Sequence, residues 1–368
     1  MNKTQIIKQF TKSVIVEKQR KNKVSSTQIT STMMLSAINL AFVNESCKSS
    51  GQVSKSQVIY RKLDGVPKEV IRKCFQEKTL KFLRLLKIFS RNRKFIISFD
   101  TTKEPFYGYF SKAEEPKYLH QSSEAKEPEY YYEYLTVSIT GNVGQRFILD
   151  GIIVRRGMYI SDWVTGMVKW IKEELPLEVI LFDRGFTSKE LIYELNKLKV
   201  SYMIFWKKQG DWYKPHFDKL KDGKFKIVKR KDKFYRRRYR YDVNLSFVFI
   251  KQLEYENKTF DWIFATNLNL NKSEDYVKRY KKRWGIETIY RVTDKIRAYT
   301  TSTRTVIRYF LFMFTCFVYN IWKYFQIFVG EDFTLANFKT NMIIYLTKKG
   351  KIYPFHYDDF ERTASRII

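Results

Sequence analysis

The sequence predicts a mixed α/β fold in which helices cover both faces of a sheet. A helical domain precedes this sheet and a basic, β-rich insertion interrupts it. Three observations support this prediction. The hydrophobic period changes from helical to strand-like at Lys94. Strands then come first in a meander and later alternate with helices, which is typical of a mixed sheet. In the segment from Lys219 to Arg240, more than half of the residues are Lys or Arg, and aromatic and β-branched residues are interleaved with them. This pattern indicates charged strands within the fold.

Composition limits the possible classes of function. The chain has 368 residues with 69 Lys and Arg against 38 Asp and Glu, a net charge of +31. Such an excess predicts a polyanionic partner, either nucleic acid or an anionic lipid surface. The 44% of hydrophobic residues can bury a sizeable core, which excludes wholesale disorder. Three cysteines without CxxC spacing and three scattered histidines argue against a disulfide framework and a histidine-rich metal site. We expect buried thiols in a reducing compartment.

Residues 1–93 are expected to form three or four short helices with a basic surface. The segment 1–23 is rich in Lys and Arg and contains a single acid, Glu17, which suits an arm that contacts phosphate. Capping signals stand at Ser25–Thr27 and Ser54–Ser56, and 69–88 has the pattern of a long amphipathic helix. One interpretation is a DNA-binding helical domain. A helical subdomain that only packs on the next region fits the same pattern.

The remainder of the chain divides at the insertion. The sheet domain is expected over 94–206 and 263–330, the insertion over 207–262 and a C-terminal tail over 331–368. Expected strands are 94–100, 130–140, 145–154, 178–183, 201–206 and 264–268. Expected helices are 161–175, 187–199, one from Ser273 to about Arg297 and one from about Thr303 to Phe328.

One uncharged stretch, Tyr309–Trp322, bears on a membrane location. It is clearly shorter than a membrane span, which needs about 20 apolar residues. A buried core helix is therefore expected. The positive charge is also spread along folded segments and not gathered beside this stretch, so we expect no membrane partner.

Two acids stand at the ends of strongly apolar strand-like runs. They are Asp100 in IISFDTT and Asp183 in VILFDRGF. Functional groups of open α/β sheets gather at the carboxyl ends of strands, and carboxylate oxygens there suit Mg²⁺. Each acid could instead cap a turn or a following helix, and Asp–Arg–Gly at 183–185 also has the composition of an ordinary turn.

A third acid, Glu287, follows on a late helix. Tyr280, Arg283 and Glu287 stand at helical spacing i, i+3 and i+7, so they share one face, and Arg291 continues it. A carboxylate with these neighbours can bind a metal ion while the neighbours bind a phosphate. A ladder of ion pairs from Glu287 to Arg283 and Arg291 would explain the same spacing.

The order of these motifs resembles the DDE transposases of prokaryotic insertion sequences, of the cut-and-paste type with a β-strand insertion before the third acid. FDTTKEPFYG (99–108) and YKKRWGIETIYR (280–291) resemble archaeal members in particular, and the resemblance covers about 94–325. It implies a ribonuclease-H-like catalytic domain in which Asp100, Asp183 and Glu287 bind two Mg²⁺ or Mn²⁺ ions. It also implies that Tyr280 and Arg283 contact DNA phosphate near the transposon end.

The sequence departs from that family's motif at one position. A lysine is expected at the position that Asp294 occupies, two helical turns after the glutamate, and Lys295 stands beside it. Arg291 or Arg297 could replace the missing phosphate contact. Asp294 is a fourth acid on the face of Glu287 and a competing ligand.

The expected activity is metal-dependent cleavage at transposon ends, followed by attack of the released 3′-OH on target DNA. The partner is then double-stranded DNA, with the chain a homodimer when assembled on it, in the cytoplasm and associated with the nucleoid. Two alternatives stay open: a ribonuclease-H-like nuclease or resolvase without strand transfer, and a transposase-derived DNA-binding protein that is no longer catalytic.

The insertion is expected to clamp DNA, because its many positive charges would otherwise repel one another. Two tryptophans near its start, Trp206 and Trp212, could stack on a displaced base or pack in the core. The expected basic contacts are Lys229, Arg230, Lys231, Arg236, Arg237, Arg238 and Arg240.

Overall fold

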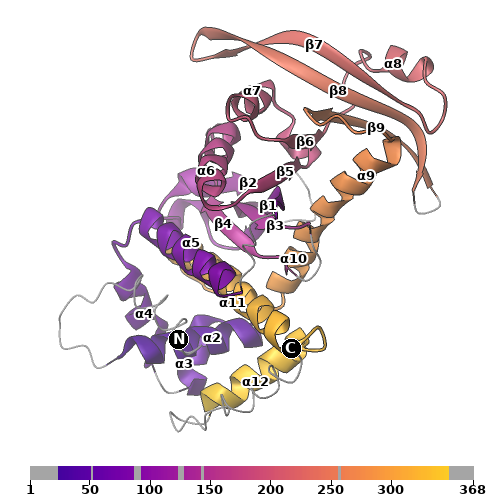
Figure 1. Cartoon of the computed structure of the whole chain (residues 1–368). Helices are drawn as coiled ribbons and strands as arrows, with labels where there is room; N and C mark the ends of the chain where they lie inside the picture. Colours follow the sequence, from indigo (N-terminus) through magenta and orange to yellow (C-terminus); the bar gives the residue numbers. More distant parts are fainter. Residues whose placement is uncertain are drawn as a thin grey trace.

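The structure is a computed structural model that describes residues 24–50, 53–86, 93–122, 128–141, 145–255 and 258–347. The basic arm expected over 1–23 lies outside the described residues, as does the end of the expected tail from 348 onward. Figure 1 shows the helical N-terminal region, the sheet and the long hairpin of the insertion one after another along the molecule.

One mixed sheet of nine strands organises the fold, in the order β2-β3-β1-β5-β6-β9-β8-β7, with β4 paired to β3. β1, β5 and β6 are parallel to one another, and the other pairs are antiparallel. The strands are β1 Phe95–Phe106, β2 Leu119–Gln121, β3 Tyr130–Ile139, β4 Ile148–Ile153, β5 Leu177–Phe182, β6 Tyr202–Phe205, β7 Phe225–Arg236, β8 Tyr239–Tyr255 and β9 Lys258–Thr266. The predicted strands of the sheet domain are confirmed. β1 is longer than expected because its pairing with β3 continues to Phe106.

Helices cover both faces of this sheet, as the predicted fold class requires. α6 (Ile160–Glu174) and α7 (Lys189–Lys197) share a hydrophobic cluster with one face. α5 (Lys68–Leu85) and α11 (Thr305–Val329) pack on each other and on β4 at the opposite face. Because apolar side chains are buried on both sides, the central strands are nearly continuous hydrophobic runs.

The N-terminal helices join the core of the sheet domain. They are α2 Ser26–Asn39, α3 Val43–Ser50, α4 Ser56–Leu63 and α5. Ser25 forms the predicted cap of α2, in a capping box with Gln28. Buried side chains of these helices belong to the same hydrophobic cluster as those of α11, and Met342 of α12 (Leu335–Thr347) packs against it. Arg72 of α5 also pairs with the fully buried Asp150 of β4. The helical region is therefore fixed to the sheet.

Helix α11 contains the uncharged stretch Tyr309–Trp322. Within the described ranges it is the one helix long and apolar enough to cross a membrane, but 94% of its most apolar window is buried inside the protein. Asn320 on this helix donates to the carbonyl of Ile148 and accepts from its amide at the edge of β4. The prediction of a buried core helix is confirmed.

The prediction of one helix from Ser273 to Arg297 is wrong. The chain forms α9 (Ser273–Lys281), a 3-10 turn (Lys282–Trp284) and α10 (Gly285–Thr293). The break lies where the backbone comes close to the end of β3, since a Cβ at position 285 would be 3.0 Å from the carbonyl oxygen of Thr140. A residue with a side chain at this position would require its neighbours to move by a few tenths of an ångström.

The insertion extends the sheet and contains the expected β structure. β7 and β8 form a long hairpin, and β8 pairs with β9, which returns to β6. A short helix, α8 (Lys214–Asp218), precedes the hairpin. β9 begins at Lys258, inside the range expected for the insertion, so the sheet domain and the insertion share this strand.

Candidate active site

The two aspartates lie side by side at one edge of the sheet. Phe99 of β1 and Phe182 of β5 are paired on adjacent parallel strands, and their rings stack at 5.2 Å. Asp100 is the next residue of β1, and Asp183 directly follows β5. Because neighbouring strands are about 4.8 Å apart, the two backbones hold these carboxylates close together.

Glu287 approaches Asp100 through a shared arginine. One guanidinium nitrogen of Arg283 is 3.1 Å from an oxygen of Asp100, and another is 2.5 Å from an oxygen of Glu287. The terminal nitrogens of one guanidinium are close neighbours, so these two carboxylate oxygens are at most about 8 Å apart. The Arg283 side chain is 6% exposed. Arg283, a buried cation, thus joins Asp100 to Glu287, and Asp183 directly follows the strand beside Asp100.

The charge at this site is incompletely balanced. Burial raises the pKa of Asp100 to about 6, and the nearby charges of Asp183 and Glu287 act in the same direction. Arg283 and the amide of Thr101 oppose this shift but do not cancel it. A second positive charge would therefore be favourable beside these carboxylates.

The three acids have the right chemistry for a divalent ion, because carboxylate oxygens are the ligands that Mg²⁺ and Mn²⁺ prefer. Within the described ranges, no group of three His, Cys, Asp or Glu side chains is already gathered closely enough to hold a metal ion. The guanidinium of Arg283 lies against two of the acids in this arrangement. The residues fit a metal site in which Asp100, Asp183 and Glu287 turn toward the ion.

The alternative explanations for these acids are also visible as contacts. Asp183 caps a 3-10 turn by accepting from the amide of Arg184, and Asp100 accepts from the amide of Thr101. Glu287 forms the expected ion pair with Arg283. Arg291 contacts Thr288. The caps and the pair leave oxygens of the acids able to bind further groups.

The basic residues near Asp294, where the motif has a lysine, differ in exposure and in their contacts. Arg297 is mostly buried and pairs with Glu104 and Asp294. Lys295 is exposed just after α10. Arg291 lines a groove on the Glu287 side of the helix. Of the two arginines considered as replacements, Arg291 is therefore the one placed to meet a phosphate.

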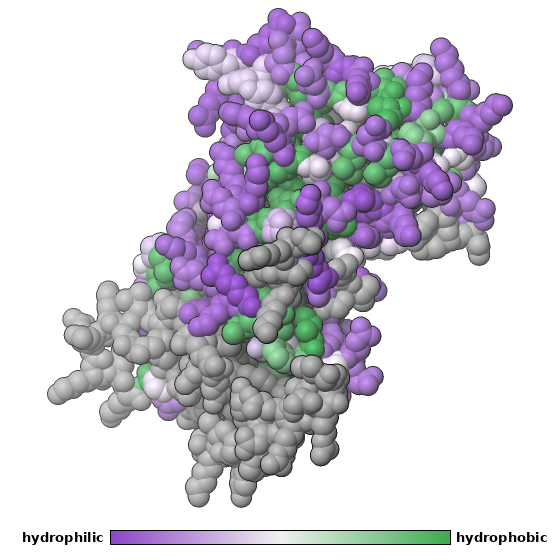
Figure 2. Space-filling view, in the orientation of Figure 1, coloured by the Kyte–Doolittle hydropathy of each residue, from purple (hydrophilic) through white to green (hydrophobic). Residues whose placement is uncertain are grey.

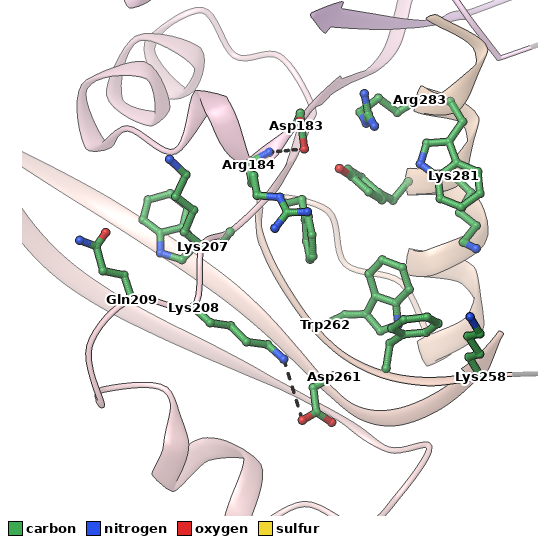
Figure 3. A pocket seen from close by; sticks show the side chains of 15 residues that line it. Asp183, Arg184, Lys207, Lys208, Gln209, Lys258, Asp261, Trp262, Lys281 and Arg283 are labelled. Carbon is green, nitrogen blue, oxygen red and sulfur yellow. Dashed lines mark hydrogen bonds and ion pairs between the residues drawn. The ribbon is translucent and has the colours of Figure 1, made fainter. Parts of the chain in front are cut away.

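A cavity of about 1120 Å³ opens beside Asp183, between the sheet edge and α9 (Figure 3). Its apolar wall includes the ring of Tyr280, which is buried against Phe205 and Phe264. Four lysines line it from the insertion and from α9: Lys207, Lys208, Lys258 and Lys281. Aromatic rings beside ammonium groups suit nucleotides, which offer both bases and phosphates.

The tryptophans around this cavity differ in exposure. Trp206 lines it but is 8% exposed and packs on Phe247. Trp212 packs against Phe247 and Phe249, and the guanidinium of Arg230 covers its ring at 4.7 Å. The most open ring is Trp284, 41% exposed, which lines both this cavity and the groove beside Glu287. Trp284 was not predicted from the sequence, although its place directly after Arg283 in the motif was a usable signal.

The basic side chains of the insertion divide into two sets. Arg230 pairs with Asp232, and Arg236 pairs with Glu190, so both point inward and stabilise the hairpin. The others are exposed and available to a ligand, with Arg240 also near Asp242. They are Lys229, Lys231, Arg237, Arg238 and Arg240, joined by Lys226 and Lys233, which the sequence analysis did not single out.

Comparisons with known proteins show what this chain is similar to. Residues 163–321 match the model of the Transposase DDE domain family, a range that includes Asp183 and Glu287. Among solved structures, the cryo-EM structure of a piggyBac transposase synaptic complex with hairpin DNA is similar to this chain, with a TM-score of 0.57 and 13% identity over 99% of this chain and 83% of that one. At this identity the likeness shows the fold, which is mixed α/β and ribonuclease-H-like. No match was found among curated proteins.

Proposed function

From the match of residues 163–321 to the Transposase DDE domain family, we propose that the chain cleaves DNA at transposon ends and joins the released 3′-OH to target DNA. The observation that carries the proposal is the pairing of Arg283 with both Asp100 and Glu287, with Asp183 at the end of the neighbouring strand, beside an aromatic, lysine-lined cavity. On this proposal the chain acts as a homodimer on double-stranded DNA, in the cytoplasm and associated with the nucleoid.

Asp100, Asp183 and Glu287 would hold two Mg²⁺ or Mn²⁺ ions. When bound, these ions supply the positive charge that stabilises the attacking and leaving oxygens of a phosphodiester. The parallel strands β1 and β5 fix the two aspartates, while Glu287 lies on a helix and is 51% exposed. Glu287 is therefore the ligand that adjusts its position as the site forms.

Arg283, supported by Tyr280, would bind the phosphate next to the scissile bond. Arg283 already lies at the acids, and the buried Tyr280 ring supports it, 5.9 Å from the guanidinium. When cations neutralise the carboxylates, the guanidinium can turn its donors to a phosphate, for which its planar fork is well suited. Trp284 and the cavity lysines would then hold the end of the duplex, with Trp206 at the cavity wall.

The exposed face of the insertion would bind the duplex farther from the cut. Lys229, Lys231 and Lys233 stand at alternate positions along β7, so they project on one side of the hairpin at regular intervals. Helices α2 to α5 form the domain proposed to bind DNA near the N-terminus, and Lys229, Lys231 and Arg240 are proposed phosphate contacts of the insertion.

The test is a cleavage and strand-transfer assay with Mg²⁺ on duplexes that carry the sequences flanking the gene. Alanine at Asp100, Asp183 or Glu287 should lower the rate by about 10³-fold or more, with DNA binding by fluorescence anisotropy largely retained. Glu274→Ala is the control, since this acid lines the groove beside Glu287 but belongs to α9.

The products separate the candidate functions. Joined transposon–target products support a transposase, whereas cleavage without joining indicates a nuclease. Binding without cleavage indicates a DNA-binding protein that has lost catalysis. Full cleavage by all three alanine variants would refute the assignment of the acids.

A further inference from the structure

We propose that the tip of the β7–β8 hairpin, residues 235–239, inserts two arginines into the minor groove of bound duplex DNA and thereby favours A·T-rich sequence. This inference rests on the proposed function, since it assumes that duplex DNA is the substrate. It adds a sequence-selecting element, at a site remote from the three acids.

The backbone of the tip is strained in an unusual way. Arg237 and Arg238 have φ angles of 46° and 71°, and they form the two-residue loop between the paired residues Arg236 and Tyr239. Two successive positive φ angles define a type I′ turn, for which Asn-Gly is the preferred sequence. A left-handed conformation costs a residue with a side chain roughly 1–2 kcal/mol. Two arginines are therefore a poor choice for making this turn.

Nothing in the described part of the chain explains the two arginines by packing. Both are exposed, and neither guanidinium forms an ion pair or a hydrogen bond with any described residue. Tyr235 and Tyr239 on either side are 72% and 71% exposed. In Figure 2 the end of the hairpin appears as a hydrophilic projection. Strained residues with no internal partner are candidates for contact with a ligand.

The tip is held rigidly by the residues directly behind it. Arg236 pairs with Asp162 and, at 2.9 Å, with Glu190, and its guanidinium lies over the ring of Tyr159. Further along the hairpin, Phe234 and Tyr241 pack on Tyr193 of α7. A turn anchored in this way can enter a ligand without the entropic cost of ordering a loop.

The anchors also place the tip on the catalytic side of the sheet. Asp162 lies in the first turn of α6, which follows β4, and Glu190 lies in the first turn of α7, which follows β5. β4 and β1 are both antiparallel to β3, so β4 ends at the same edge as β1 and β5. This is the edge that carries Asp100 and Asp183, and a duplex bound there can reach the tip.

The shape of the hairpin selects the minor groove. The major groove, about 12 Å wide, admits a whole two-stranded ribbon, but one face of this ribbon is already packed on α7. Only the turn projects freely, and it ends in two adjacent guanidinium groups. Arginines of this kind are attracted into the narrow, strongly negative minor groove of A·T-rich DNA.

The test exchanges the strained pair for the sequence that the turn prefers. Arg237→Asn combined with Arg238→Gly keeps the type I′ turn and should leave the melting temperature unchanged or raise it. The control, Lys197→Asn combined with Lys199→Gly, also removes two exposed positive charges and relieves a positive φ, 53° at Lys199, where α7 ends. All three proteins are measured by anisotropy, in EDTA, on duplexes made of A·T, G·C or inosine·cytosine pairs.

Inosine·cytosine pairs decide which groove is read, because they present the major groove of G·C without the amino group in the minor groove. We expect the wild type and the control to bind A·T and inosine·cytosine duplexes about tenfold more tightly than G·C. The turn variant should lose this preference. Equal wild-type affinity for all three duplexes, inosine·cytosine behaving as G·C, or a preference that survives in the variant would overturn the inference. Strand transfer by the wild type, measured in parallel, tests the proposed function separately.

Discussion

Strand β1 carries two acids on the same side, and they lie in contrasting surroundings. Asp100 and Glu104 are an even number of positions apart and are similarly buried, with side chains 19% and 14% exposed. Glu104 accepts from Arg308 at 3.1 Å and from the hydroxyl of Tyr134 at 2.8 Å, and Arg297 is 3.7 Å away. Asp100 has one arginine, which it shares with Glu287.

The difference between these two surroundings indicates that Glu104 has a structural role and that Asp100 is suited to binding a metal ion. Glu104 pairs with two arginines, Arg308 and Arg297, so its negative charge is balanced, and the pairs join β1 to the start of α11. The carboxylates around Asp100 outnumber the cations beside them, so the charge of this region is balanced only when another cation binds. Replacing each acid by its amide tests this comparison, because the amide keeps the shape and removes the charge.

The largest loss of stability is expected for Glu104→Gln. The change leaves two arginines, 7% and 15% exposed, without their carboxylate, and breaking a buried pair in this way costs about 3 kcal/mol or more. Urea unfolding measures the loss. Glu133→Gln is the matched control, since among the described residues the carboxylate of Glu133 on β3 forms an ion pair with His120 alone, at 3.8 Å. Equal losses in the two variants would show that the Glu104 network is not structural.

Asp100→Asn should have the opposite sign in the metal-free protein. The pKa of Asp100 in the folded chain, about 6, is above its ordinary value of 3.8, so folding favours the protonated form. The metal-free protein should therefore lose stability as the pH rises from about 4 to 6, and more weakly above that range. At pH 7.5 in EDTA the amide should be about 1–3 kcal/mol more stable than the wild type.

Two outcomes would contradict this view of Asp100. One is a variant that is less stable than the wild type at pH 7.5 in EDTA. The other is a wild type whose melting temperature rises between pH 4 and pH 6 relative to that of the variant. Mg²⁺ provides a further comparison, because it should stabilise the wild type and leave the variant nearly unchanged.

Much of the site was predictable because its signals are local. An acid directly after an apolar strand-like run identified both Asp100 and Asp183, although only Asp183 follows a strand end, since β1 continues past Asp100 to Phe106. The spacing of Tyr280, Arg283 and Glu287 was sufficient to place all three near each other, although the helix that carries them is broken. The spacing was enough because the 3-10 turn between α9 and α10 alters the helical register only slightly.

The rest depended on contacts between segments far apart in the sequence. The late helix is interrupted just before Gly285, which lies against Thr140, the residue that follows β3. The inward direction of Arg236 is set by acids on α6 and α7, two helices that come well before the hairpin in the chain. The basic run therefore predicted a charged hairpin but not which arginines remain available to DNA. Glu104 was missed for the same reason, since its partners come from α11 and from the segment after α10.

The smallest change in stability is expected for Glu287→Gln, which is also the sharpest test of the comparison. Glu287 is 51% exposed, and its pair with Arg283 spans one helical turn, so its loss should change stability by about 0.5 kcal/mol or less. Strand transfer should nevertheless fall as far as in Asp100→Asn, because both amides remove a metal-binding charge. The Mg²⁺-induced rise in melting temperature should fall with it. A Glu287→Gln protein that retains both the activity and the Mg²⁺ response would remove Glu287 from the site and make its contact with Arg283 an ordinary helical ion pair.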